Sequence, residues 1–176
     1  MQLHSEGLVV LERMKGFRVA SISIEHLQDL ARVRIEMEGT AIRWSIEYGD
    51  VDWEADILGA FHRLSKRKKM HDEMNSGIDP YWRDAHRAFH TALMAACRSP
   101  LLISICDSLF DQAERYVALS IRHIDQPRND IGEHEGIMHA ALARDARSAI
   151  ELTQQHIGRT AEKVAAASAM FSEKAG

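Results

Sequence analysis

Proline and glycine are scarce in this chain of 176 residues, which contains three prolines and ten glycines. Because these residues most often interrupt helices, their scarcity favours long, uninterrupted helices. The chain also has only two cysteines, Cys97 and Cys106, and no paired-cysteine metal spacing, which excludes a secreted disulfide framework. We expect both thiols to be reduced, small core residues of a cytoplasmic protein.

Long apolar runs and an excess of positive charge are also absent. No stretch approaches the roughly 20 apolar residues of a membrane-spanning helix, so we expect no membrane partner. We also expect no signal peptide, since no basic segment followed by an apolar run opens the chain. The formal net charge is -4 at pH 7, so the chain as a whole lacks the basic footprint of a nucleic-acid-binding domain. The ten histidines are the unusual feature of the composition.

The pattern of residues 1–22 differs from that of the remainder. Two short runs that contain β-branched residues, 8–11 and 17–22, flank a Met-Lys-Gly turn. This arrangement predicts a β-hairpin. After it, apolar residues recur at helical spacing, with cap and turn signals between the segments.

The helical pattern predicts six helices joined by short connections. We expect them at about residues 24–48, 51–74, 80–98, 100–123, 130–144 and 146–171. Such a series predicts an all-α fold, an antiparallel bundle preceded by the hairpin. The chain therefore divides into a short N-terminal segment, 1–22, and a helical domain, 23–176.

A pair of histidines on the third predicted helix is the first functional signal. Asp79 can cap this helix, and Pro80 suits its first position. His86 and His90 are four residues apart, so they lie on one helical face and can point at one ion. Such a pair by itself is more often an ordinary surface or core feature than a metal site.

Two further histidines, His134 and His156, stand on the fifth and sixth predicted helices. A buried imidazole needs a partner for each ring nitrogen, and a metal ion can be that partner. Zinc and similar ions bind neutral imidazole nitrogens, and helical bundles build such sites from facing helices. The sequence therefore suggests a divalent metal held by His86, His90, His134 and His156.

The segment HEGIMH, residues 134–139, resembles the zinc-protease motif H-E-x-x-H with one residue too many. Five residues turn a helix by about 140° beyond one full turn, so His134 and His139 diverge. We therefore do not expect Glu135 to act as a general base. We expect His139 to be exposed or to lie behind the ligands. The remaining histidines are expected at the surface: His4, His26, His62, His71 and His123.

Several motifs, taken together, resemble one known family. Residues 3–23 read LHSEGLVVLERMKGFRVASIS. They resemble the end of the winged helix-turn-helix of GntR-type bacterial transcription regulators. The following motifs resemble the effector-binding FCD domain of the FadR branch: DLARVRIEMEGTA, FHTALMAACRSPLL and EHEGIMHAALARDARSAIELTQQH. The segment DQAERYVALS is similar to the subgroup of carbon-starvation regulators.

The resemblance implies a sensor whose divalent metal is held by three histidines and an aspartate. His90, His134 and His156 match the three histidines, whereas the aspartate position is occupied by His86. Asp84 lies on the wrong side of the helix to replace the aspartate. Either His86 is the fourth ligand, or three protein ligands bind the metal and His86 helps to hold the effector. Zinc is the expected metal, with nickel or manganese as alternatives.

The resemblance also implies a small carboxylate effector, a homodimer and, more often than not, a repressor. Arg34 matches a family arginine that faces the effector pocket, and its planar guanidinium suits a carboxylate. The alternative role for Arg34 is a salt bridge to Glu38, four residues later.

The N-terminal segment takes its expected role from the same resemblance. Residues 1–6 match the end of the recognition helix and residues 8–22 match the wing, so Lys15, Gly16 and Arg18 form the expected remnant of the DNA-binding surface. The family's reading head needs about fifty further residues. We therefore expect this chain to bind effector and to dimerise, with DNA bound only through the full winged helix-turn-helix.

Two other functions remain open on the sequence alone. One is a metal-free helical interaction module, in which the histidines are hydrogen-bonded core residues. The other is a metalloenzyme, which requires an open position on the metal and a poised base. Since no carboxylate stands at a convincing spacing for that base, we expect no enzymatic activity.

Overall fold

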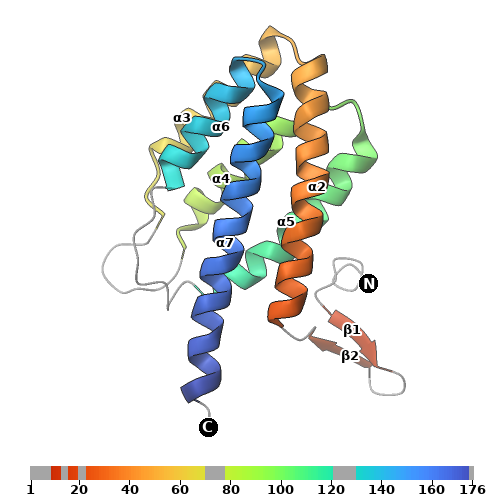
Figure 1. Cartoon of the computed structure of the whole chain (residues 1–176), viewed down its shortest axis with the longest axis vertical. Helices are drawn as coiled ribbons and strands as arrows, with labels where there is room; N and C mark the ends of the chain where they lie inside the picture. Colours follow the sequence, from red (N-terminus) through yellow and green to blue (C-terminus); the bar gives the residue numbers. More distant parts are fainter. Residues whose placement is uncertain (1–8, 13–15, 20–22, 70–77, 121–129, 175–176) are drawn as a thin grey trace.

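Helices make up almost all of the computed structural model, which describes residues 9–12, 16–19, 23–69, 78–120 and 130–174 (Figure 1). Within these ranges there are six helices, and all of the predicted ones are present. They are α2 (Ile24–Tyr48), α3 (Val51–Ser65), α4 (Pro80–Met94), α5 (Pro100–Ser120), α6 (Asp130–Leu142) and α7 (Ala146–Lys174). The predicted all-α fold is confirmed.

A β-hairpin precedes the bundle, as predicted. Strands β1 (Val9–Glu12) and β2 (Gly16–Val19) pair in antiparallel fashion, with Val9 opposite Val19 and Glu12 opposite Gly16. Lys15 and residues 1–8 lie outside the described residues. The role of Lys15, Gly16 and Arg18 in DNA binding therefore stays a prediction.

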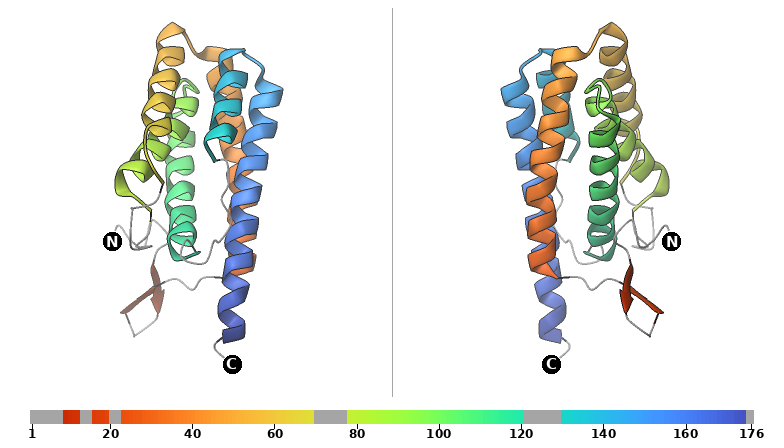
Figure 2. Two further views of the ribbon diagram at one scale, coloured as in Figure 1. Left: turned by 90° about the vertical axis from the view of Figure 1, so that its left-hand side faces the viewer. Right: turned by 90° about the vertical axis from the view of Figure 1, so that its right-hand side faces the viewer.

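The six helices form two layers, which are seen edge-on in Figure 2. Helices α2, α6 and α7 lie in one layer, and α3, α4 and α5 lie in the other. Apolar side chains from both layers meet between them and form the main core, which includes Ile42, Ile57, Phe89, Leu93 and Ile137. A smaller apolar cluster joins α2, α5 and α7 and includes Leu27, Leu30, Tyr116 and Val164.

The helix starts follow the capping signals of the sequence. The side chains of Ser23, Asp50 and Asp79 each accept a hydrogen bond, 3.0 Å long, from a backbone amide in the first turn that follows. Such bonds satisfy amides that have no partner within the helix. The predicted entry points of α2, α3 and α4 are thus explained by single residues.

Helices α3 and α4 end well before their predicted ends. Helix α3 ends at Ser65 rather than near residue 74, because Leu64 is its last buried residue and the basic run that follows has no apolar face to bury. Helix α4 ends at Met94 rather than near residue 98. There the amide of Cys97 bonds to the carbonyl of Met94, three residues back, and Arg98 adopts a φ of 57°, which turns the chain into α5.

The turn between α6 and α7 is tied to the turn between α2 and α3. Arg144 has a φ of 58°, in the left-handed region that ends helix α6 two residues before the predicted end at 144. Its guanidinium donates to the carbonyl oxygens of Ile46 and Gly49 at 2.9 and 3.0 Å. A Cβ at Gly49 would collide with the ring of Trp53, so glycine suits this turn.

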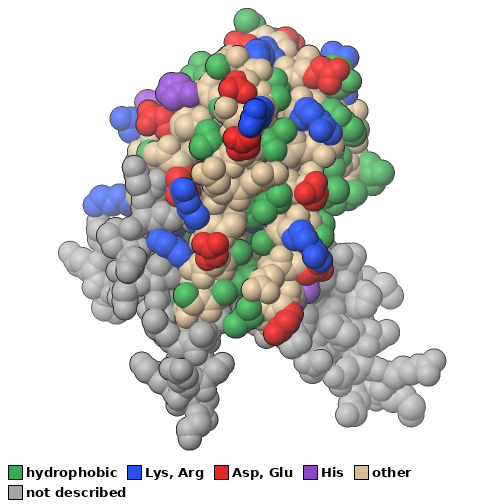
Figure 3. Space-filling view, viewed as in Figure 1, with side chains coloured by type: hydrophobic (Ala, Val, Ile, Leu, Met, Phe, Trp, Pro, Cys, Tyr) green, Lys and Arg blue, Asp and Glu red, His purple; other side chains and the backbone are tan. Residues whose placement is uncertain are grey.

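The surface and the thiols agree with the composition. Acidic and basic side chains are interspersed over the face that α2 and α7 present in Figure 3. Among the described residues, no helix is both long and apolar enough to cross a bilayer. Cys97 and Cys106 are buried and unpaired, as expected, and burial raises the pKa of the Cys106 thiol to about 12.

The packing between the layers can be tested by a substitution at Phe89. Its side chain is fully buried and lies against Phe61 and His134. We expect Phe89→Ala to lower the free energy of unfolding by about 3–5 kcal/mol through the cavity that it leaves. Urea denaturation measures this loss. Tyr81→Ala on the same helix is the control, since Tyr81 is 68% exposed. Equal effects of the two substitutions would contradict this packing.

Candidate metal centre

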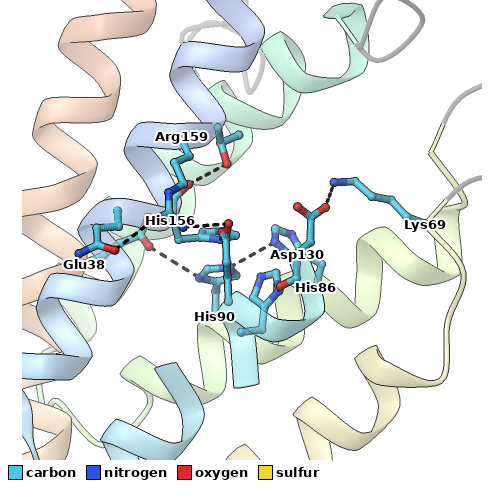
Figure 4. A network of polar contacts seen from close by, with 11 residues as sticks. Glu38, Lys69, His86, His90, Asp130, His156 and Arg159 are labelled. Carbon is cyan, nitrogen blue, oxygen red and sulfur yellow. Dashed lines mark hydrogen bonds and ion pairs between the residues drawn. The ribbon is translucent and has the colours of Figure 1, made fainter. Parts of the chain in front are cut away.

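Four histidines converge between the two layers of the bundle. His86 and His90 come from α4, His134 from α6 and His156 from α7. One ring nitrogen of each lies within 4.8 Å of the corresponding nitrogen of every other. Figure 4 shows several of these rings together with their polar neighbours. The structure thus brings together all four of the histidines that the sequence suggested.

The two histidines of α4 already stand at chelating distance. Their Nε2 atoms are 3.2 Å apart, and their ring centroids are 4.7 Å apart. In a tetrahedral zinc site with bonds of about 2.0–2.1 Å, neighbouring nitrogens are about 3.3 Å apart. The four-residue helical spacing therefore produces the separation that two ligands of one ion require.

The rings of His134 and His156 are held by hydrogen bonds on their outer nitrogens. Nδ1 of His134 donates to the backbone carbonyl of Asp130 at 2.5 Å, and Nδ1 of His156 lies 2.9 Å from Oε2 of Glu133. Histidines that bind metals commonly make such bonds, which fix the tautomer and orient the ring. With the proton on Nδ1, the lone pair of each ring is on Nε2.

The lone pair of His134 makes no hydrogen bond within the described part of the chain. Nε2 of His134 is buried and has no hydrogen-bond partner among the described residues. Leaving such a buried polar atom unsatisfied costs about 1–3 kcal/mol. A metal ion at the centre of the four rings would satisfy it, so the residues fit a divalent cation.

A buried ion pair lies next to the cluster on the side of α2. Nε of Arg34 donates to Oε1 of Glu38 at 2.7 Å, and both residues are buried. Oε2 of Glu38 lies 3.9 Å from Nδ1 of His90. The salt bridge foreseen as the alternative for Arg34 is therefore present, and its contact with an effector stays a prediction.

Burial keeps the imidazoles in the neutral form that a metal binds. It lowers the pKa of His134 to about 3, with His156 as the second cause. Burial also lowers the pKa of His86 and of His90 well below the ordinary value, and the neighbouring histidines add to the effect. These three rings are uncharged at neutral pH, so each has one N–H group and one nitrogen lone pair that can be donated to a metal ion.

The remaining histidines and Asp84 lie away from the cluster. His139 and His62 are exposed, as expected. His26 is exposed as well, but its Nδ1 lies 2.6 Å from the hydroxyl of Tyr116, a contact that the sequence did not suggest. Asp84 is exposed. His4, His71 and His123 lie outside the described residues.

Several functional neighbours escaped the sequence reasoning. Glu133 is adjacent to His134 in the chain but serves His156 on another helix. Trp82 stacks on His86 at a centroid distance of 4.7 Å and an interplanar angle of 13°. The spacing of Trp82 and His86, four residues apart on one helix, could have suggested this stack. Nothing in the sequence marks Glu133.

Comparison with known proteins adds three findings. Residues 29–159 match the sequence profile of the FCD domain. The chain is 37% identical over 157 residues to the HTH-type transcriptional regulator BphR of Paraburkholderia xenovorans (strain LB400), covering 88% of this chain and 63% of BphR. It is also 37% identical over 160 residues to the HTH-type transcriptional repressor GlaR of Escherichia coli (strain K12), covering 89% and 72% of the two chains.

A solved structure shows the same fold. The Zn²⁺-bound FCD domain of TM0439 superposes with a TM-score of 0.59 at 16% identity, covering 83% of this chain and 96% of that domain. The chain thus spans less than two thirds of BphR but nearly the whole of an FCD domain. The relatives are named as transcription regulators, not as enzymes.

The lowered histidine pKa values predict that the metal-free protein loses stability in acid. The unfolded chain takes up protons as the pH falls below about 6.5, whereas the folded His134 does so only near pH 3. Stability is therefore lost as the pH falls through this window, by about 2 kcal/mol at pH 5 for this imidazole alone. Urea denaturation with a chelator at pH 7 and pH 5 measures the loss.

Replacing His134 by Gln should reduce this pH dependence, whereas His139→Ala should not change it, because His139 is exposed. A metal-free protein equally stable at both pH values would contradict the burial of neutral imidazoles.

Proposed function

Because the chain belongs to the FCD-domain family of GntR-type transcription regulators, we propose that it is the ligand-sensing, dimerising domain of a bacterial DNA-binding repressor. It binds a small organic acid next to a divalent metal held by histidines. The observation that carries this proposal is the convergence of four imidazoles from three helices, two of them held from behind by hydrogen bonds.

The proposed metal ligands are His90, His134 and His156, together with His86. A set of nitrogen donors suits zinc or nickel better than magnesium or manganese, which prefer oxygen ligands. Zinc is therefore our first choice, and the Zn²⁺-bound FCD domain of TM0439 supports it. When bound, the ion supplies a positive charge and a coordination position for an acidic group.

Cationic side chains next to the cluster favour an anionic effector. The guanidinium carbons of Arg34 and Arg87 lie 5.2 and 4.7 Å from the centroid of the Phe110 ring. That ring is in turn 5.7 Å from His86 and 5.8 Å from His90, measured between centroids. Arg34 is paired with Glu38 and Arg87 with Asp111, so an acid at the metal would bind a guanidinium group by competing with one of these carboxylates.

Effector binding would regulate DNA binding by changing the balance between two dimer geometries. An effector can shift this balance only if it binds the two states with different affinity. In this proposal residues 1–22 belong to the winged helix-turn-helix, and residues 23–176 form the sensing and dimerising domain. DNA contact by Lys15, Gly16 and Arg18 requires the complete reading head.

The metal centre is tested by titrating chelator-treated protein with Zn²⁺. We expect one ion per chain and a higher melting temperature, since a ligand selective for the folded state stabilises by about 2.7 kcal/mol at 100 times its Kd. His134→Ala and His156→Ala should each abolish this gain, whereas His139→Ala should keep it. Absence of binding by the unaltered protein would favour the metal-free interaction module.

The effector class is tested by a thermal-shift panel of small carboxylic acids on zinc-loaded protein. At least one acid should raise the melting temperature, and Arg34→Gln should weaken its binding by about tenfold or more, as expected for a lost charge-assisted hydrogen bond. Arg32→Gln on the same helix is the matched control, because Arg32 is exposed and pairs with Asp29. Stabilisation by neutral analogues alone would contradict a carboxylate effector.

A further inference from the structure

We infer that His86 is the exchangeable member of the histidine cluster, which yields its place at the metal to a carboxylate of the effector. This inference rests on the proposed metal centre and adds that its four histidines have different roles. The other three histidines keep the metal in place whether or not an acid is bound.

The outer nitrogens of the four rings differ in how they are held. Nδ1 of His134 and Nδ1 of His156 each have a hydrogen-bond acceptor, at 2.5 and 2.9 Å. Nδ1 of His90 faces the buried carboxylate of Glu38 at 3.9 Å. The hydrogen bonds fix the direction of the His134 and His156 rings and raise their basicity as ligands, and the carboxylate near His90 favours the same protonation of its Nδ1 through its charge.

His86 lacks this support in the described part of the chain. Its Nδ1 is buried without a hydrogen-bond partner among those residues. When Nε2 binds a metal, Nδ1 carries the proton of the neutral ring, so a buried N–H is left without an acceptor. Binding through His86 is thus weaker than binding through a ring that is held from behind.

The environment of His86 also permits the ring to move. His86 is only half-buried, whereas the other three rings are buried. Its ring stacks on Trp82, whose plane differs from that of His86 by 13°, and its other ring contacts are with the rings of the cluster and of Phe110. Because Nδ1 makes no hydrogen bond with any described residue, movement of the ring along Trp82 would break only the contact of its Nε2 with Nε2 of His90, 3.2 Å away.

Two basic side chains lie on the side of the cluster where His86 is found. Nζ of Lys69 lies 4.8 Å from the centroid of the Trp82 ring, and Arg87 follows His86 directly in the chain and lies over Phe110. A carboxylate that replaces His86 would exchange a neutral ligand for a charged one next to these cations. Both cations are paired with carboxylates, Lys69 with Asp130 and Arg87 with Asp111, and the incoming acid would compete with these partners for them.

The experiment compares Co²⁺ binding by the unaltered chain, His86→Ala, His134→Ala and the surface control His139→Ala. Affinities come from competition with a chromophoric chelator. We expect His86→Ala to bind one Co²⁺ with affinity reduced by about tenfold or less, and His134→Ala to lose about 100-fold or more. His139→Ala should match the unaltered chain.

The exchange itself is followed through the visible spectrum of bound Co²⁺ while succinate or acetate is added. We expect the spectrum of the unaltered chain to change toward that of His86→Ala with the same acid. His86→Ala should bind the acid about tenfold more tightly, because the imidazole no longer competes for the position.

The outcomes separate this inference from the proposed function. If the unaltered chain binds Co²⁺ but His86→Ala and His134→Ala lose affinity equally, His86 is an ordinary ligand and the inference is overturned while the metal centre stands. A spectrum of the unaltered chain that neither acid changes also overturns the exchange. If the unaltered chain binds no metal ion at all, the metal centre itself is refuted.

Discussion

Four imidazoles packed together inside a protein must all find partners for their ring nitrogens, and this requirement shapes the centre of the bundle. Water cannot solvate these atoms freely, so each unsatisfied nitrogen carries a cost of about 1–3 kcal/mol. The structure meets the requirement at the outer nitrogens of His134 and His156, and it leaves inner nitrogens of all four rings within 4.8 Å of one another. Neutral rings whose lone pairs point toward one another are suited to bind a cation, because the ion gives each lone pair a partner.

The same requirement connects the cluster to the N-terminal part of the chain. Glu38 lies behind His90 and is fixed by Arg34, and both belong to α2, the helix that begins at Ile24 just after the hairpin. Glu38 and Ser23 are separated by 15 residues of sequence, or about 22 Å of helix. Since a helix of this length is stiff, the proposed function would have a change in the ligands of the metal passed along α2 to the segment proposed to carry DNA contacts. Such coupling requires α2 to have two discrete positions. It would run from the contact between Glu38 and His90 to the start of α2 at Ile24.

Much of the fold could be predicted because local chemistry decides it. Ser23, Asp50 and Asp79 cap helices where they were expected, since a short polar side chain before an apolar periodic run has few other roles. The prediction failed after Leu64, where a basic run has good helical propensity but no surface to bury. Propensity without packing does not maintain a helix, and packing is a property of the whole fold.

The site was predictable only in part, for a related reason. The spacing of His86 and His90 fixes their common face, whereas the meeting of His134 and His156 with them depends on how α6 and α7 pack. The resemblance to a family suggested that meeting. The outer partners were invisible because they are chosen by distance in space, as when Glu133 bonds to His156, 23 residues away. Residues that orient ligands therefore have to be found in a structure.

The exchange of an aspartate for His86 changes the charge of the centre more than its shape. The family pattern implied by the resemblance places one carboxylate among the ligands, which reduces the charge of a divalent ion and its shell to one. Four neutral imidazoles leave the full charge of two. One additional unit charge at 4 Å is worth about 4 kcal/mol at an effective dielectric constant of 20. Arg34 and Arg87 next to Phe110 are each paired with a carboxylate, so the ion would be the main source of this positive field. A centre built in this way attracts an anion more strongly than the family pattern does, and it supplies in His86 a neutral ligand that the anion can replace.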